Sequence, residues 1–178
     1  MSNCGIITTP KKDLCVYLHW DSGLEKVKPL LLFCKVQGSR SPAVDNSGWG
    51  RICQTYGNFV GCGSIGAVVD HYDKMKDWIT DNGIYVIDEE WNIIERINAP
   101  NDEKDPTEDE MMKMIGYFDS NLPENDRIPM EYYRYAVQGR FPKMTYEEIR
   151  YIRGYNAVVI PRARRDLREF FRPADGFR

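Results

Sequence analysis

Two short segments rich in isoleucine, residues 84–88 and 93–97, constrain the fold more than any other feature of the chain. They flank the polar stretch 89–92, and a turn signal at residues 81–83 precedes them, which predicts a β-hairpin with a short loop. Hairpin strands are antiparallel, and strands alternate with helices only early in the chain, so a doubly wound parallel sheet is disfavoured. The sequence predicts an α+β fold in which several helices pack on a small mixed or antiparallel sheet with a central hairpin.

Apolar periodicity predicts the remaining elements. Residues 15–20 alternate as a strand does. Ser22 and Glu25 have the spacing of a capping box, which predicts a helix that begins there and ends near Gln37. Helical spacing and helix-start signals predict further helices, with one more strand between the last two. The helices are expected at residues 49–59, at 68–79, from Thr107, from Pro129, at 145–154 and at 162–172, and the strand at 157–160.

Length and composition predict two parts that pack as one unit. Residues 1–98 are expected to form the α+β core with the hairpin, and residues 99–178 a mainly helical C-terminal part. No apolar run approaches the ~20 residues that a membrane helix needs. The N-terminus has no charged start followed by an apolar stretch, as a signal peptide would. The sequence therefore predicts no contact with a membrane and a cytoplasmic location in the cell that makes the protein.

Groups suited to catalysis are sparse. His19, Asp21 and Ser22 are neighbours in the sequence, but a catalytic triad needs three groups that converge in space. The five cysteines contain no C-x-x-C pair, which argues against zinc. The acidic residues 88–90 fit a solvated hairpin turn better than a cation site. We therefore predict no catalytic residue, no metal and no cofactor, and a protein that is not an enzyme.

Acidic and basic residues are distributed unevenly along the chain. Residues 70–127 hold 17 carboxylates and 6 Lys or Arg, whereas residues 128–178 hold 11 bases and 6 acids. Such asymmetry usually concerns partners, which predicts binding to a basic nucleic-acid-binding protein or ribonucleoprotein. The candidate partner-binding residues are the densest acidic cluster and the C-terminal arginines. They are Asp102, Glu103, Asp105, Glu108, Asp109 and Glu110, together with Arg162, Arg164, Arg165 and Arg168.

Two simpler interpretations of these charges stay open. Glu108, Asp109 and Glu110 suit the dipole of a helix that starts there, whatever the function. The arginines could pair with the acidic middle of the same chain, or they could contact phosphates, which would indicate a nucleic-acid-binding regulator. The choice between these arrangements depends on whether the two charged regions are neighbours in the fold.

A glycine-rich stretch supports an alternative function. Gly61, Gly63 and Gly66 match G-x-G-x-x-G, and Asp88 follows a later predicted strand, as in a dinucleotide-binding enzyme. That motif needs a buried strand just before its first glycine, whereas residues 51–60 have a helical pattern. A plain glycine-rich turn is the preferred interpretation.

Three stretches, residues 16–23, 48–59 and 81–87, resemble in order and spacing a group of small proteins carried by phages and mobile elements of Gram-positive gut bacteria. The resemblance covers about residues 14–97. Small proteins from this setting include inhibitors of host defence, among them anti-CRISPR proteins that bind Cas9. The resemblance thus implies a non-enzymatic inhibitor, with Cas9 and its guide RNA as the candidate partner. Because Cas9 holds nucleic acid in a positively charged channel, a carboxylate-rich surface could compete for that channel.

Overall fold

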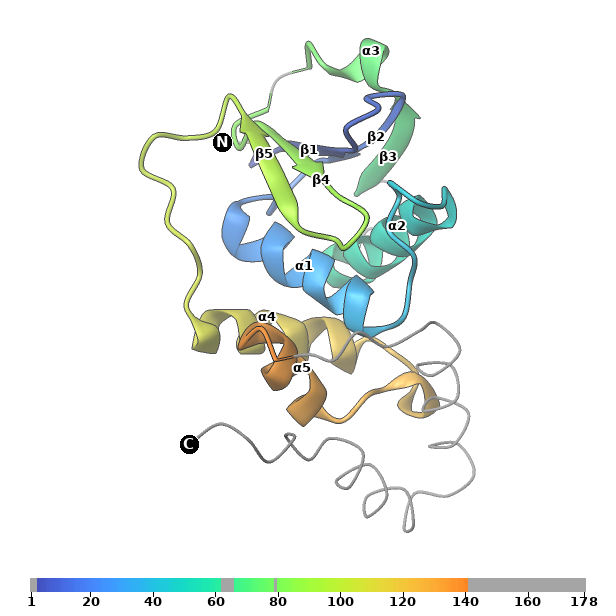
Figure 1. The fold of residues 1–178 in the computed structure, drawn as a ribbon, viewed down its shortest axis with the longest axis vertical. Helices are drawn as coiled ribbons and strands as arrows, with labels where there is room; N and C mark the ends of the chain where they lie inside the picture. The colour runs from blue at the N-terminus through green and yellow to red at the C-terminus, as the bar shows by residue number, and fades with distance from the viewer. Residues whose placement is uncertain (1–2, 62–65, 79, 141–178) are drawn as a thin grey trace.

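In the computed structural model, which describes residues 3–61, 66–78 and 80–140, five strands form one mixed sheet in the order β3-β2-β1-β4-β5 (Figure 1). The strands β1 and β4 are parallel, and every other neighbouring pair is antiparallel. This confirms the predicted α+β fold, and β4–β5 is the predicted hairpin. The strand bounds are Gly5–Thr8 for β1, Leu14–Leu18 for β2, Ala67–His71 for β3, Ile84–Ile87 for β4 and Ile93–Ile97 for β5.

Two strands differ from the sequence prediction. The strand β1 was not predicted, and it lies at the centre of the sheet, between β2 and β4. All four of its residues are buried, so it shows no polar–apolar alternation. The helix predicted at residues 68–79 is wrong in its first half, because residues 67–71 form β3 and pair with all of β2. Helix α3 begins only at Tyr72 and spans Tyr72–Met75.

Helices form two layers on one side of the sheet. Helices α1 (Leu24–Val36) and α2 (Ser47–Val60) lie next to the sheet, and α4 (Glu108–Ser120) and α5 (Met130–Val137) lie beyond α1 (Figure 1). The short 3₁₀ helix η2 (Glu124–Asp126) lies between α4 and α5. Phe33 of α1 joins the two helical layers, since its ring stacks on Tyr133 at 5.5 Å and packs against Phe118 at 5.6 Å. The predicted helices at 49–59, from Thr107 and from Pro129 are therefore confirmed.

The opposite face of the sheet has a smaller apolar cluster. Ile6, Cys15, Tyr17 and Ile84 project from the strands, and Met75 of α3 packs on them. The Trp78 ring makes an edge contact with Tyr17 at 5.0 Å between centroids. This thin cover contrasts with the two helical layers on the other face.

The start of α1 corrects another prediction. Ser22 and Glu25 do not form a capping box, because Gly23 is the N-cap residue and no side chain caps this helix. The Ser22 hydroxyl instead donates a hydrogen bond of 2.8 Å to the Asn3 carbonyl. Among the described helices, none has the length and apolarity needed to cross a membrane. The elements predicted at 145–154, 157–160 and 162–172 lie outside the described residues.

Candidate functional site

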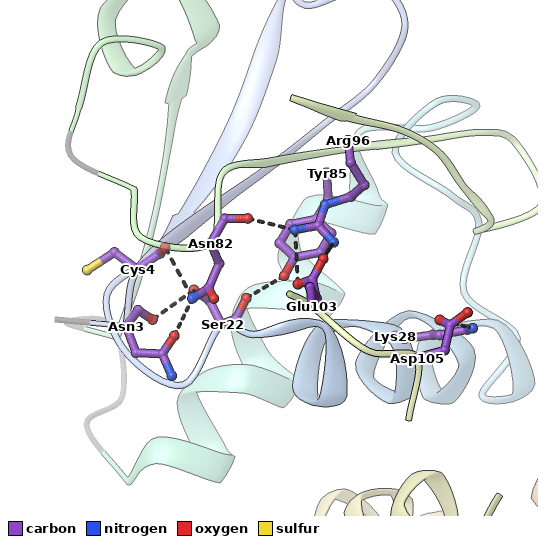
Figure 2. Close-up of polar contacts among 9 residues, drawn as sticks. All are labelled: Asn3, Cys4, Ser22, Lys28, Asn82, Tyr85, Arg96, Glu103 and Asp105. Carbon is purple, nitrogen blue, oxygen red and sulfur yellow. Dashed lines mark hydrogen bonds and ion pairs between the residues drawn. The ribbon is translucent and has the colours of Figure 1, made fainter. Parts of the chain in front are cut away.

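The acidic segment, residues 102–110, connects the sheet to the α4–α5 layer and is anchored at two points (Figure 2). Glu103 pairs with Arg96 of β5 through both carboxylate oxygens, and the two side chains are only 15% and 17% exposed. Asp105 pairs with Lys28 of α1 at 2.7 Å, and these side chains are 73% and 43% exposed. A half-buried pair and an exposed pair therefore fix the course of the segment across α1.

Arg96 links the acidic segment to the core of the sheet. Its guanidinium lies over the Tyr85 ring, and one of its nitrogens donates a bond of 2.7 Å to the Asn82 carbonyl. The Tyr85 hydroxyl donates to the Ser22 carbonyl at 2.7 Å. Burial raises the pKa of Tyr85, while the nearby Arg96 charge acts in the opposite direction. Arg96 is thus held by a carboxylate, a carbonyl and an aromatic face at once (Figure 2).

Asn82 extends this network to the N-terminus. Its side-chain amide donates to the Asn3 side-chain oxygen, to the Cys4 carbonyl at 3.4 Å and to the Ser22 hydroxyl at 3.2 Å. The network joins the residues before β1, α1 and β4, which are distant in sequence. Because buried polar groups are costly without partners, these bonds fix the three chain segments relative to one another.

The other acidic-segment residues have different surroundings. Glu110 forms a capping box with Thr107, and these bonds from Thr107 lower the pKa of Glu110. Glu108 accepts a bond of 2.9 Å from the Gln138 side chain. Asp102 and Asp109 are exposed and form no ion pair with the residues that the structure describes. Among the contacts of the described residues, these two carboxylates are the ones of the six that have no side-chain partner.

A cleft of about 630 Å³ lies between α1, the β4–β5 hairpin and the α4–α5 layer. Its apolar lining includes Leu32, Trp91 and Val137. Its charged lining consists of three ion pairs, in which Lys28 contacts Asp105, Lys35 contacts Glu90 and Arg96 contacts Glu103. The acidic segment therefore forms one wall of the cleft. Paired charges beside apolar side chains are suited to binding.

The glycine motif is not arranged as in a dinucleotide site. Helix α2 precedes Gly61, which is left-handed with φ 68°, and β3 follows Gly66, so the order of strand and helix is reversed. Gly63 lies outside the described residues. Asp88 stabilises the hairpin loop, where it accepts backbone bonds from Glu90 and Asn92. Gly61 therefore ends helix α2, and Asp88 belongs to the turn of the hairpin.

The candidate catalytic neighbours also have structural contacts. Ser22 is buried in the Asn82 network, and the His19 ring packs edge-on against Tyr17 at 4.8 Å. Within the described ranges, no three His, Cys, Asp or Glu side chains are grouped to hold a metal ion. The predicted Arg162, Arg164, Arg165 and Arg168 lie outside those ranges.

Sequence reasoning missed Arg96, Asn82 and Tyr85. The available signal was a basic residue in the middle of a predicted hairpin strand, directly before the acidic segment. The comparisons with known proteins add no further residue to the site. No protein-family model, no curated protein and no solved structure matches this chain.

Proposed function

We propose that this protein is a non-enzymatic binding protein that presents its acidic segment to a basic surface of a nucleic-acid-handling protein. The observation that carries the proposal is the double anchoring of the segment, by Glu103 on Arg96 and by Asp105 on Lys28. The anchors fix the backbone course of the segment that carries Asp102 and Asp109, which form no ion pair with any described residue. Preorganised groups bind with a smaller loss of conformational entropy than mobile ones.

The charge of residues 3–140 supports the same proposal. Residues 3–140 contain 22 carboxylates and 15 Lys or Arg. A negative surface attracts a basic partner over about a Debye length, which speeds association and makes binding sensitive to salt. The resemblance to phage-borne proteins suggests Cas9 with its guide RNA as the first partner to test, since its nucleic-acid channel is positively charged.

The experiment uses the full chain and the purified Cas9–guide RNA complex, with DNA cleavage and equilibrium binding as readouts. We expect Asp102→Lys with Asp109→Lys to weaken binding about tenfold or more, which corresponds to ~1.4 kcal/mol. The matched control is Glu89→Lys with Asp77→Lys, which reverses two exposed carboxylates outside the segment and is expected to change binding less than threefold.

Three results would contradict the proposal. The unmodified chain could fail to bind the complex, the control could lose as much affinity as the double variant, or guide RNA alone could bind as tightly as the complex. Binding that weakens steeply with added salt, and only in the segment variant, would support it.

A further inference from the structure

A second cavity, of about 450 Å³, lies between the loop after α1 and the first turns of α2. It is separate from the acidic segment, and its described lining includes six polar side chains, those of Ser39, Arg40, Asp45, Ser47, Arg51 and Gln54. Gly38 and Gln37 also border the cavity, but the Gln37 side chain is fully buried and donates to the Tyr133 hydroxyl. The cavity thus places two arginines of an acidic protein beside one polar hollow.

Among the described residues, Arg40 and Arg51 have no carboxylate partner of the kind that Arg96 has. The Arg51 side chain donates a bond of 2.9 Å from Nε to the Ser39 hydroxyl, which is neutral. Within residues 3–61, 66–78 and 80–140, neither Arg40 nor Arg51 forms an ion pair. Arg51 is also half-buried. A guanidinium that is partly removed from water is stabilised when it binds an anion through two parallel hydrogen bonds.

The one acid at the cavity is already engaged. Asp45 accepts a bond of 2.8 Å from the Ser47 backbone N–H. Hydrogen bonds from Ser47 are the main cause of the lowered pKa of Asp45, and the Arg40 charge adds to them. Asp45 therefore occupies the N-terminal end of α2, and the positive charge left for a ligand is that of the arginines.

The walls of the cavity are fixed before any ligand arrives. A Cβ atom at Gly48 would lie 2.6 Å from the Arg40 carbonyl oxygen, so the loop backbone packs directly on the first turn of α2. The Trp91 indole donates a bond of 3.0 Å to the Ser39 carbonyl. The Ser41 hydroxyl donates to the Asp88 carbonyl at 2.6 Å. The loop that carries Arg40 is thus held by both α2 and the hairpin.

We propose that this cavity binds the phosphate group of a small phosphorylated molecule, with Arg51 and Arg40 as its cationic ligands. The amide of Gln54 supplies further hydrogen bonds, whereas the Ser47 hydroxyl is already bonded to Asp45. The volume falls in the range of roughly 300–1,000 Å³ that small-molecule sites occupy. The described lining offers no aromatic or aliphatic side chain, so it suits phosphate itself or a compact phosphomonoester rather than a molecule that buries an apolar ring.

The test titrates the full chain with inorganic phosphate and, separately, with glycerol phosphate, against chloride at equal ionic strength. Tryptophan fluorescence reports on the site, because Trp91 is bonded to Ser39 of the cavity wall. We expect a saturable change that Arg40→Gln and Arg51→Gln each weaken at least tenfold. Arg134→Gln removes an exposed arginine of α5 and is the matched control, with an expected change below twofold.

The outcomes are decisive in both directions. Saturation by inorganic phosphate assigns the site to the phosphate group alone, and saturation only by glycerol phosphate assigns it to a phosphomonoester. No saturation by either probe overturns the proposal, as does an equal loss in the Arg134 variant. Because Arg40 is exposed, Arg40→Gln leaves the fold intact, which unchanged circular dichroism verifies, so the test does not depend on the more buried Arg51.

Discussion

The guanidinium carbon of Arg96 lies 3.8 Å from the centroid of the Tyr85 ring. The two residues are also direct partners in the β4–β5 ladder. A cation over an aromatic face is favourable, and more so away from water. Because Arg96 also binds Glu103, the acidic segment is attached to the inner face of the sheet. Substitutions in that segment should therefore change the free energy of unfolding.

The two anchors of the acidic segment should differ in strength. Replacing Glu103 by Gln removes the charge that balances the half-buried Arg96, and we expect a loss of about 3 kcal/mol in the free energy of unfolding. Replacing Asp105 by Asn breaks an exposed pair, and we expect a loss below about 1 kcal/mol. Urea denaturation of both variants measures the difference. Equal losses would mean that burial does not distinguish the two pairs.

A second variant tests how much of the loss in Glu103→Gln comes from leaving the charge of Arg96 buried without a partner. Arg96→Met in the Glu103→Gln background removes the unbalanced charge, so this double variant should be more stable than Glu103→Gln alone. If it is less stable, the contacts of Arg96 with Tyr85 and the Asn82 carbonyl outweigh the cost of its unpaired charge.

The elements that the sequence predicted are those with local signals. The hairpin was predictable because β4 and β5 pair across a short loop, and α2 and α4 because each repeats its apolar positions over 13 residues or more. The strand β1 has four residues, and β3 pairs with a strand some 50 residues earlier. The strand β1 pairs locally with β2, but its buried residues give no alternation, and its pairing with β4, like that of β3 with β2, joins distant chain segments.

The same reasoning explains what was missed in the candidate sites. The acidic segment was found because composition alone shows it. Arg96, which anchors the segment, was missed because the sheet determines that the Arg96 side chain points toward the core. Arg40 and Arg51 are single basic residues that belong to no sequence motif. Their two chain segments come together through the close approach of the loop backbone to Gly48.

Two glycines of α2 should respond in opposite directions to alanine. Gly48→Ala places a Cβ 2.6 Å from the Arg40 carbonyl oxygen, which the fixed loop cannot easily avoid, and we expect a loss of about 1–3 kcal/mol. Gly50 has open space at the Cβ position, so Gly50→Ala should gain about 0.5–1 kcal/mol from helix propensity. Thermal denaturation shows whether each variant is more or less stable than the unmodified protein. A stable Gly48→Ala variant would contradict the close packing of the loop.

Buried thiols should resist alkylation in the native protein. Cys15 and Cys34 have no exposed surface, and burial raises the pKa of each to about 12. Cys53 is half-exposed, and burial raises its pKa as well. Since the thiolate is the reactive form and needs access to reagent, iodoacetamide near pH 8 should modify Cys53 before Cys15 or Cys34. Peptide mass spectrometry measures the order, and guanidinium chloride should abolish it. Early modification of Cys34 in the native state would contradict its burial.

The same thiols should make the fold sensitive to alkali. The pKa of Cys34 is about 12 in the native state and near 9.0 when unfolded, so between these values the unfolded chain binds fewer protons than the native one. The stabilising contribution is therefore complete below pH 9 and is lost as pH rises toward 12, by up to about 1.4 kcal/mol per pH unit for each thiol. Urea denaturation at a series of pH values measures this slope. Cys34→Ala should reduce the slope by the contribution of one thiol and leave the contribution of Cys15. An unchanged slope would show that Cys34 ionises as easily in the folded protein as in the unfolded chain.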